Sequence, residues 1–176
     1  YLSDQWYVAV KKPIEHLAAR VDAGMIEGTD VPINSLAGLA LKPLVDGRLR
    51  FIPERYAKTY QTWLENLRDW PISRQLWWGH RIPVWSKAGV QKTASAGVAV
   101  QAGSSDTGPV TYVCVAPGNT EAEQRLEKDG WKRDSDVLDT WFSSALWPFS
   151  TLGWPEATPE MKTFYPGNVL CTAREI

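Results

Sequence analysis

The segment from Asp134 to Pro155 constrains the fold of this chain more than any other stretch. It holds three tryptophans, two phenylalanines and two prolines among small hydroxyl residues, and three aspartates precede the aromatic run. A short oxygen side chain at Asp139 or Thr140 can cap a helix, because it accepts from the free N–H groups of the first turn. Pro148 lacks an N–H and clashes with the preceding turn, so we expect it to end or redirect that helix.

Two interpretations of the expected helix, Trp141–Leu146, stay open. In the first, an amphipathic helix buries its Trp141/Ala145 side in a core. In the second, the helix is one wall of a small-molecule pocket, where a rigid indole sets the size of the cavity. The segment alone favours the first interpretation.

Composition narrows the class of protein. The 176 residues suit one domain or a domain with an insert, and the net charge of −1 gives no basic excess that would indicate nucleic acid. No apolar run approaches the ~20 residues of a membrane span, and no signal peptide is visible. Cys114 and Cys171 lack a CxxC or histidine-rich neighbour, so we expect reduced packing thiols and no metal site. Ten tryptophans indicate aromatic walls or a dense core.

The two ends suggest a piece of a longer protein. The chain opens with Tyr1 and stops at Ile176, directly after an apolar run and without the composition of a tail. We therefore expect that its function belongs to a larger protein.

Periodicity and turn residues predict helices and strands along the whole chain. Apolar residues typical of a core-facing stripe mark the helix expected from Pro53, namely Tyr56, Tyr60, Trp63, Leu64 and Leu67. Ser86–Pro109 is rich in small residues and is interpreted as a surface hairpin or a partly ordered insert. The expected helices are 13–21, 35–45, 53–68 and 121–128, and the expected strands are 2–10, 49–52, 110–116 and 168–172. Candidate helix caps are Ser35 and either Asn119 or Thr120.

A second dense stretch, Asp69–Trp85, interleaves positive side chains with aromatic ones. Its cationic members are Arg74, His80 and Arg81, set among Trp77, Trp78 and Trp85. Such a mixture can bind a phosphate or nucleotide. It can equally brace a loop against a core, and a hydrogen-bonded structural histidine is the simpler role for His80.

Together the two dense stretches resemble the class I valyl-tRNA synthetases. Asp69–Trp85 and Asp136–Pro155 match two blocks of that family in order and spacing, and Leu2–Val8 fits the block where the chain returns from the editing insert. Isoleucyl and leucyl enzymes are similar around Ile72–Gln75. They usually place Asp at Ser143, however, and lack the continuation over 147–155.

The resemblance implies an α/β fold, the second half of a Rossmann-type catalytic domain with a small β-rich insert. Residues 1–85 would return from the editing insert into the catalytic domain. Residues 86–133 would form the insert, and 134–176 the segment of the amino-acid site. The implied enzyme is a cytoplasmic valine-tRNA ligase of protein biosynthesis, which also edits its tRNA. It activates valine with ATP and Mg²⁺ and transfers it to tRNA(Val).

The resemblance also implies roles for particular residues. Trp141 would form a wall of the valine side-chain pocket, and Ile176 would touch the side chain. Glu175 stands where the family usually has Asp, which pairs with the substrate's α-amino group, since an unpaired charge in a dry pocket is costly. An indole wall excludes larger side chains but not isosteric threonine, so the family needs editing. Supporting residues of the same site would be Arg74, Trp78 and His80.

Some positions depart from the family pattern. Pro71 replaces a usual Cys, and Ala173-Arg174-Glu175-Ile176 replaces Gly-x-Asp-Ile. The ATP signatures HIGH and KMSKS are absent, and Gly79–Ile82 is not HIGH. We therefore expect the isolated chain to be catalytically silent and to bind no cofactor. Its partners would be valine, ATP and tRNA(Val) within the complete enzyme, the rest of the synthetase chain, and no membrane.

Two other classes of function, a binding module and a hydrolase, also fit parts of the sequence. A non-catalytic module could hold a sugar or a proline-rich peptide on Trp77, Trp78 and Trp85. A hydrolase could use Ser73 or Ser143 with His80 and an Asp, although no Gly-x-Ser-x-Gly elbow is present. We also expect the isolated chain to self-associate through apolar helix faces and strand edges near 169–171.

Overall fold

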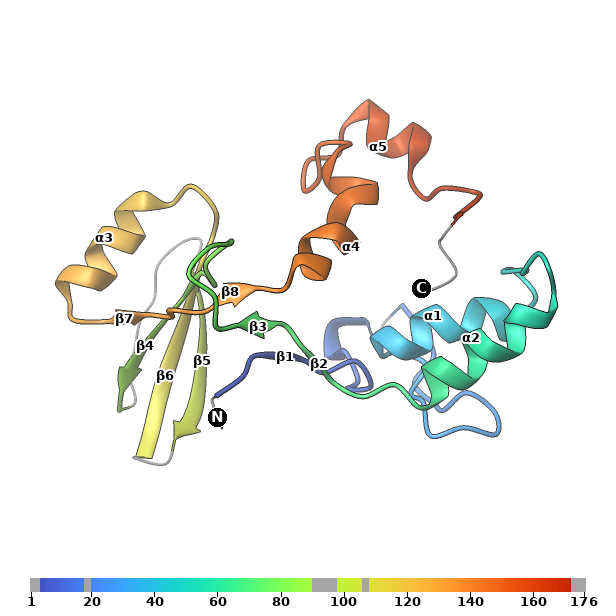
Figure 1. Ribbon diagram of the computed structural model, residues 1–176, viewed down its shortest axis with the longest axis horizontal. Coiled ribbons are helices and arrows are strands. Elements are labelled where there is room, and N and C mark those ends of the chain that lie inside the picture. Colours follow the sequence, from blue (N-terminus) through green and yellow to red (C-terminus); the bar gives the residue numbers. More distant parts are fainter. Residues whose placement is uncertain (1–3, 18–19, 90–97, 106–107, 172–176) are drawn as a thin grey trace. The chain divides into compact units, whose positions relative to one another are not determined.

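The computed structural model describes residues 4–17, 20–89, 98–105 and 108–171 (Figure 1). The chain divides into two compact units, Tyr1–Ile72 and Ser73–Ile176. Helices and short strands mix in the described ranges, where every strand ladder is antiparallel. The expected mixed α/β class is confirmed, whereas the division at residues 85 and 133 stays a prediction.

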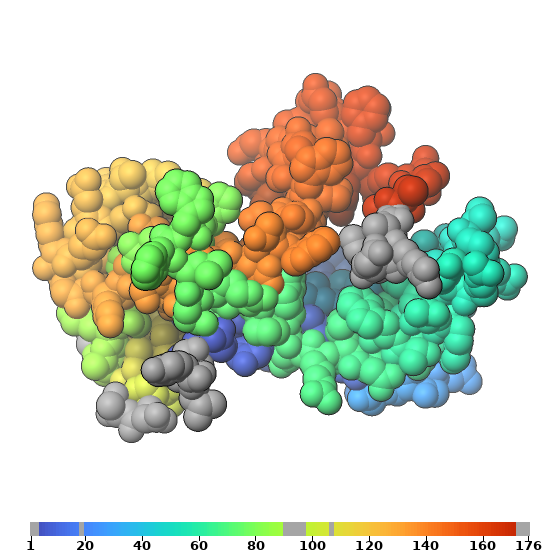
Figure 2. Space-filling model, viewed as in Figure 1, coloured from blue at the N-terminus to red at the C-terminus, as the bar shows by residue number. Residues whose placement is uncertain are grey.

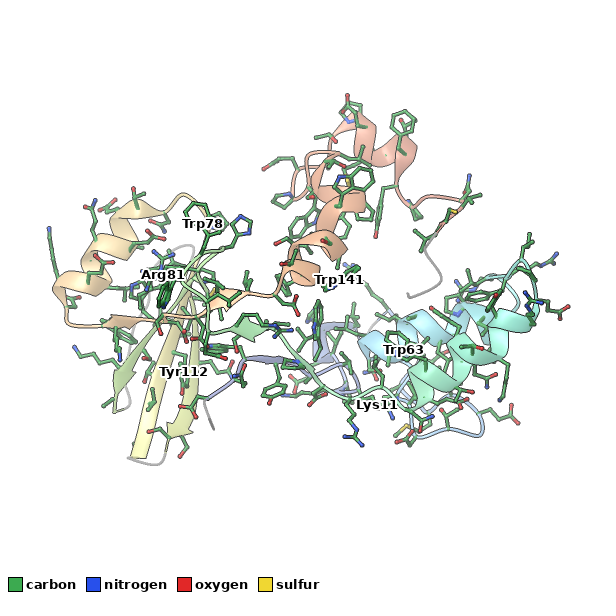
Figure 3. All side chains as sticks on the ribbon, viewed as in Figure 1. Lys11, Trp63, Trp78, Arg81, Tyr112 and Trp141 are labelled. Atoms are coloured by element: carbon green, nitrogen blue, oxygen red, sulfur yellow. The ribbon has the colours of Figure 1, made fainter. Side chains whose placement is uncertain are left out.

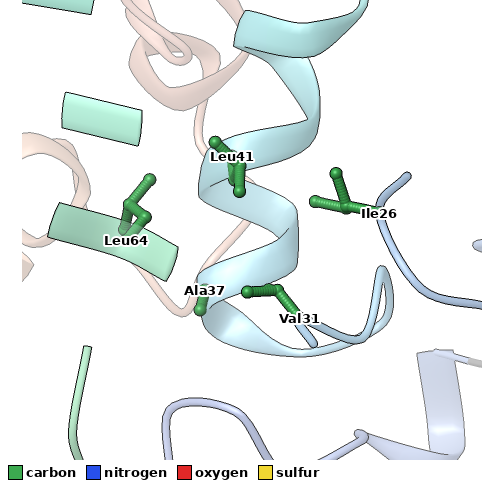
Figure 4. Packing of buried hydrophobic residues seen from close by; sticks show 5 residues of the cluster. All are labelled: Ile26, Val31, Ala37, Leu41 and Leu64. Carbon is green, nitrogen blue, oxygen red and sulfur yellow. The ribbon is translucent and has the colours of Figure 1, made fainter. Parts of the chain in front are cut away.

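The first unit is a helical pair with a small ladder. Its core contains Ile26, Val31, Ala37, Leu41 and Leu64, contributed by the loop before the first helix and by both helices (Figure 4). Strands β1 and β2 pair antiparallel. The elements are β1 (Tyr7–Val8), the 3-10 helix η1 (Glu15–Leu17), α1 (Leu36–Val45), α2 (Arg55–Glu65) and β2 (Trp70–Pro71).

Helix α1 is set by its first turn. The buried Ser35 hydroxyl accepts from the Gly38 N–H at 3.0 Å and donates to the Pro32 carbonyl at 2.7 Å. A Cβ at Gly38 would lie 2.0 Å from that same carbonyl oxygen. Glycine therefore lets the loop pack directly on the helix, and the predicted cap at Ser35 is confirmed.

Some sequence predictions for this unit are wrong. The helix expected over 13–21 is only the short η1 turn in the described residues, and 49–52 forms no strand. The strand expected over 2–10 is reduced to β1, with residues 1–3 outside the described part. Of the predicted stripe on α2, Leu64 is buried but Tyr56 and Trp63 are exposed, because α1 covers only one side of α2.

The second unit carries a four-stranded sheet of order β5-β6-β4-β7 with helix α3 beside it (Figure 1). Its core consists of Trp85, Val113, Val115, Leu126 and Trp131. The elements are β3 (Ser73–Arg74), β4 (Val84–Ala88), β5 (Val98–Ser105), β6 (Gly108–Val115), α3 (Thr120–Lys128), β7 (Lys132–Arg133), β8 (Val137–Leu138), α4 (Thr140–Ser150) and α5 (Pro159–Phe164). The hairpin expected within 86–109 is shifted along the chain: β5 pairs with β6, which runs on to Val115, and β4 pairs with β6 rather than with β5 in the described residues.

Helix α4 corrects two predictions. It runs through Pro148 to Ser150. Phe149, one residue after the proline, packs edge-on against Trp154 and Tyr165 at 5.4 and 5.5 Å between ring centroids, which holds the last turn in place of the lost hydrogen bond. The side expected to be buried, Trp141/Ala145, is exposed instead. The half-buried side carries Phe142, Ser143, Leu146 and Phe149.

Two further predictions fail near the end of the described chain. Residues 168–171 are exposed and form no strand, because no neighbouring strand pairs with them in the described residues; Thr172 lies outside that part. Cys114 and Cys171 are both free and exposed, so they are not packing thiols. No helix in the described ranges is long and apolar enough to span a membrane.

Candidate functional site

Strand β8 holds together the two tryptophan-rich stretches. Along one edge it pairs with β3, with Ser73 opposite Leu138 and Arg74 opposite Val137. Along the other edge the Leu138 N–H donates to the His80 carbonyl at 2.8 Å, and the Ile82 N–H donates to the Asp136 carbonyl at 3.0 Å. Residues 75–79 therefore cross from one edge of β8 to the other.

The crossing requires glycine at position 79. Gly79 has φ +147°, and a Cβ there would lie 3.0 Å from both Cβ and Cγ2 of the buried Val137. A larger residue would combine a strained backbone with a steric clash against the strand. Gly79 thus fixes how closely the loop passes over β8.

Asp139 joins the loop to the start of α4. One carboxylate oxygen accepts from the Trp141 N–H at 3.0 Å, which caps the helix, and the other pairs with the Arg74 guanidinium. The Asp139 side chain is only 9% exposed. A carboxylate this deeply buried is tolerated because each of its oxygens accepts a hydrogen bond, one of them from a guanidinium. The first turn of α4, with Trp141, is therefore held by β3.

Two more side-chain contacts span the same junction. The Gln75 amide donates to Asp136 at 2.7 Å. His80 Nδ1 lies 3.4 Å from the Ser143 hydroxyl, on the half-buried side of α4. Three separate contacts therefore tie residues 74–80 to the segment that contains β8 and the first turns of α4.

The indoles of the site are exposed. Trp141 is 59% exposed, and both Trp77 and Trp78 are exposed on the loop. Figure 3 labels Trp78 and Trp141. A shallow hollow of about 420 Å³ is lined by Gln75, Leu76, Trp77 and Trp78. The space-filling view shows this green part of the chain at the surface (Figure 2). These rings are available to a ligand or to further protein.

The structure places the predicted site residues unevenly. Arg74 and His80 contact the start of α4, so they support the turn that carries Trp141. Trp78 lies on the loop between them. The predicted valine-binding residues Glu175 and Ile176 lie outside the described residues.

Sequence reasoning missed the partners that make this junction. It identified Asp139 as a cap but not as the partner of Arg74, which is 65 residues away. It treated Ser143 only as a family difference and as one candidate nucleophile, and it gave Asp136 no role. The spacing of these residues carries no signal for pairing across such a separation, because the pairing depends on the register of β3 and β8.

The donor groups of the junction do not form a metal site. In the described part of the chain, no three His, Cys, Asp or Glu side chains come together to hold a metal ion. The three aspartates of the junction are engaged by Arg74, Gln75 and backbone N–H groups.

Comparison with known proteins identifies the family of the chain. A family model described as tRNA synthetases class I (I, L, M and V) matches residues 1–176. The chain therefore belongs to the class I tRNA synthetases.

The individual relatives are valine--tRNA ligases. Those of Rhodopirellula baltica, Chromobacterium violaceum and Neisseria gonorrhoeae are 40%, 43% and 44% identical over 100%, 99% and 99% of this chain. The chain spans only 17%, 15% and 15% of the length of these three proteins.

Proposed function

We propose that this chain is part of a valyl-tRNA synthetase and contributes the valine side of the amino-acid site. The observation that carries the proposal is the similarity to valine--tRNA ligases over essentially the whole chain. The tryptophan-rich stretches that suggested this family from sequence are the ones joined at β8. The complete enzyme would act in the cytoplasm.

In the proposed reaction, a carboxylate oxygen of valine attacks the α-phosphorus of ATP. Valyl-adenylate forms and pyrophosphate leaves. A hydroxyl of the 3′-terminal ribose of tRNA(Val) then takes the valyl group, and AMP leaves. ATP and Mg²⁺ belong to the complete enzyme, so the isolated chain is expected to show no valine-dependent ATP–pyrophosphate exchange.

Within this scheme Trp141 limits the size of the amino acid. Its backbone is fixed by the Asp139 cap, while its ring stays exposed and so is free to contact a substrate. A rigid indole excludes a larger side chain by overlap, and one added methylene typically gives about 10–200-fold discrimination. Glu175 is proposed to pair with the α-amino group and Ile176 to touch the side chain.

The test uses a chimaeric enzyme. The matching segment of the Chromobacterium violaceum valine--tRNA ligase, which aligns with 99% of this chain, is replaced by this chain. Valine-dependent ATP–pyrophosphate exchange is then measured for wild type and Trp141→Ala, with isoleucine and threonine as competitors. We expect Trp141→Ala to raise the KM for valine and to admit isoleucine.

Trp147→Ala is the matched control, because Trp147 lies on the same helix and is 67% exposed against 59% for Trp141. It should leave the valine-to-isoleucine ratio unchanged. Equal valine-to-isoleucine ratios in wild type, Trp141→Ala and Trp147→Ala would show that Trp141 does not line the valine pocket.

The exposed Trp77, Trp78 and their shallow hollow favour a second candidate, a non-catalytic module that binds a sugar or a proline-rich peptide. This candidate predicts that the isolated chain binds a proline-rich peptide saturably, with a change in tryptophan fluorescence that Trp77→Ala abolishes. The synthetase assignment predicts no such saturation.

A further inference from the structure

We propose that the contact between His80 and Ser143 is a positioning device for amino-acid selection. It would fix the loop that carries Trp78 to the helix that carries Trp141. The inference rests on the proposed function and deepens it. Both residues would be positioning residues, which act on the substrate through the neighbouring indoles.

The two residues stand at matching places beside the indoles. His80 follows Trp78 by two residues, and Ser143 follows Trp141 by two. The His80 backbone is anchored, because its carbonyl accepts from the Leu138 N–H at 2.8 Å. Ser143 lies one helical turn after the Asp139 cap. In this proposal, a change in the position of either residue is transmitted through the backbone to the indole two residues before it.

The other side-chain contacts of the junction involve other parts of the two segments. The Arg81 guanidinium donates to the Asp134 carbonyl at 2.7 Å, ahead of β8. Arg74–Asp139 holds the cap, and Gln75–Asp136 holds the start of the loop and the residue before β8. Neither contact reaches the loop beyond residue 75 or the helix beyond its first turn. The His80–Ser143 contact joins the loop to α4 beyond its first turn, at the indole-bearing end of the junction.

The chemistry of the pair suits positioning. At 3.4 Å, the Nδ1–Oγ contact is at the long end of hydrogen bonding. The hydroxyl can donate to a bare Nδ1 or accept from a protonated one, so the contact survives either tautomer. In the described residues no carboxylate is hydrogen-bonded to the His80 ring to orient it, as a nucleophile–base pair would require. The geometry thus favours a structural brace over a hydrolytic dyad.

The test uses the chimaeric synthetase defined above with His80→Ala, Ser143→Ala and the double variant. We expect each single variant to raise the KM for valine and to lower the valine-to-isoleucine ratio roughly tenfold, with kcat within about twofold. Because both changes remove one contact, the double variant should resemble the singles.

Conservative variants separate positioning from general damage to the fold. Asn places an amide near the position of Nδ1, so His80→Asn should restore the ratio, whereas His80→Gln should not. Ser143→Thr keeps the hydroxyl and should also restore it. The matched control is Ser144→Ala, because that neighbouring hydroxyl donates to the Thr140 carbonyl within α4 and should not affect selection.

The outcomes distinguish this inference from the proposed function. A wild-type chimaera without valine activation contradicts the proposed function. An active wild type whose His80→Ala and Ser143→Ala variants behave like Ser144→Ala contradicts only this inference. If the alanine variants fail to fold, His80→Asn and His80→Gln still test the inference. Equal valine-to-isoleucine ratios in these two variants would contradict the positioning role of His80.

Discussion

At the scale of single residues, the close crossing of the loop over β8 depends on Gly79. At its φ of +147° any other residue would be strained, and a Cβ at this position would lie only 3.0 Å from Val137. In the sequence this glycine stands out only as part of a misleading likeness to HIGH. Its role could not be predicted, because it depends on a contact with residue 137.

Gly79→Ala should destabilise the second unit by roughly 2–4 kcal/mol, since backbone strain and the clash with Val137 add. Gly47→Ala is the control, because Gly47 also has positive φ (+73°) but a Cβ there would meet nothing within 4 Å. Urea unfolding followed by circular dichroism measures both. Equal losses in the two variants would show that the Val137 contact contributes nothing.

Cys114 gives a prediction on reactivity. Partial desolvation on the sheet raises the pKa of its thiol above the usual value. The reactive thiolate is therefore scarcer at a given pH than in an unperturbed thiol. In a Cys171→Ser background, iodoacetamide at about pH 8, near the unperturbed thiol pKa, should modify native Cys114 more slowly than the urea-unfolded chain. Equal rates would contradict the desolvation.

At the scale of elements, the features that depend on neighbouring residues in the sequence, such as helix caps, could be predicted. Ser35, Asn119 and Asp139 all cap helices as expected, because a cap needs only a short oxygen side chain and the next turn. Of the two outcomes expected at Pro148, an end or a change of direction, the end was wrong: α4 runs on to Ser150, and Phe149 packs against Trp154 and Tyr165. The Arg74–Asp139 pair was not predictable, because nothing local encodes the register of β3 against β8.

Asp139 both caps α4 and pairs with Arg74, and these two roles can be tested by comparison with Asn119, which only caps α3. Asp139→Ala should cost about 1–3 kcal/mol, because it removes the α4 cap and the partner of Arg74 together. Asn119→Ala, which removes the bond to the Ala122 N–H at the start of α3, should cost about 1 kcal/mol. Asp139→Asn keeps an oxygen for the cap and should fall between wild type and Asp139→Ala in urea unfolding. If Asp139→Asn is as unstable as Asp139→Ala, the loss of stability comes from the carboxylate charge alone and not from the cap.

At the scale of the whole molecule, the α/β class and the family could be read from the sequence, because two long tryptophan-rich blocks occur in the family order. The supposed buried strand near 169–171 was wrong, since an apolar run alone does not specify a partner strand. Val169 and Leu170 are instead 88% and 84% exposed. Exposed apolar side chains of this kind favour association with another protein surface.

We therefore expect the isolated chain to self-associate as its concentration rises, as measured by sizing chromatography with light scattering. Val169→Ser combined with Leu170→Ser should shift the equilibrium toward monomer. Ile52→Ser, at another highly exposed apolar residue, serves as the control for general loss of apolar surface. A wild-type chain that stays monomeric at high concentration would contradict the prediction.

The most direct test of the central claim is amino-acid-dependent ATP–pyrophosphate exchange by the wild-type chimaera, with valine, threonine and isoleucine compared at equal concentration. We expect strong exchange with valine, weaker exchange with threonine and almost none with isoleucine, because the pocket selects by size and shape. Exchange that is absent with all three amino acids, or strongest with isoleucine, would contradict the assignment of this chain to the valine side of the site.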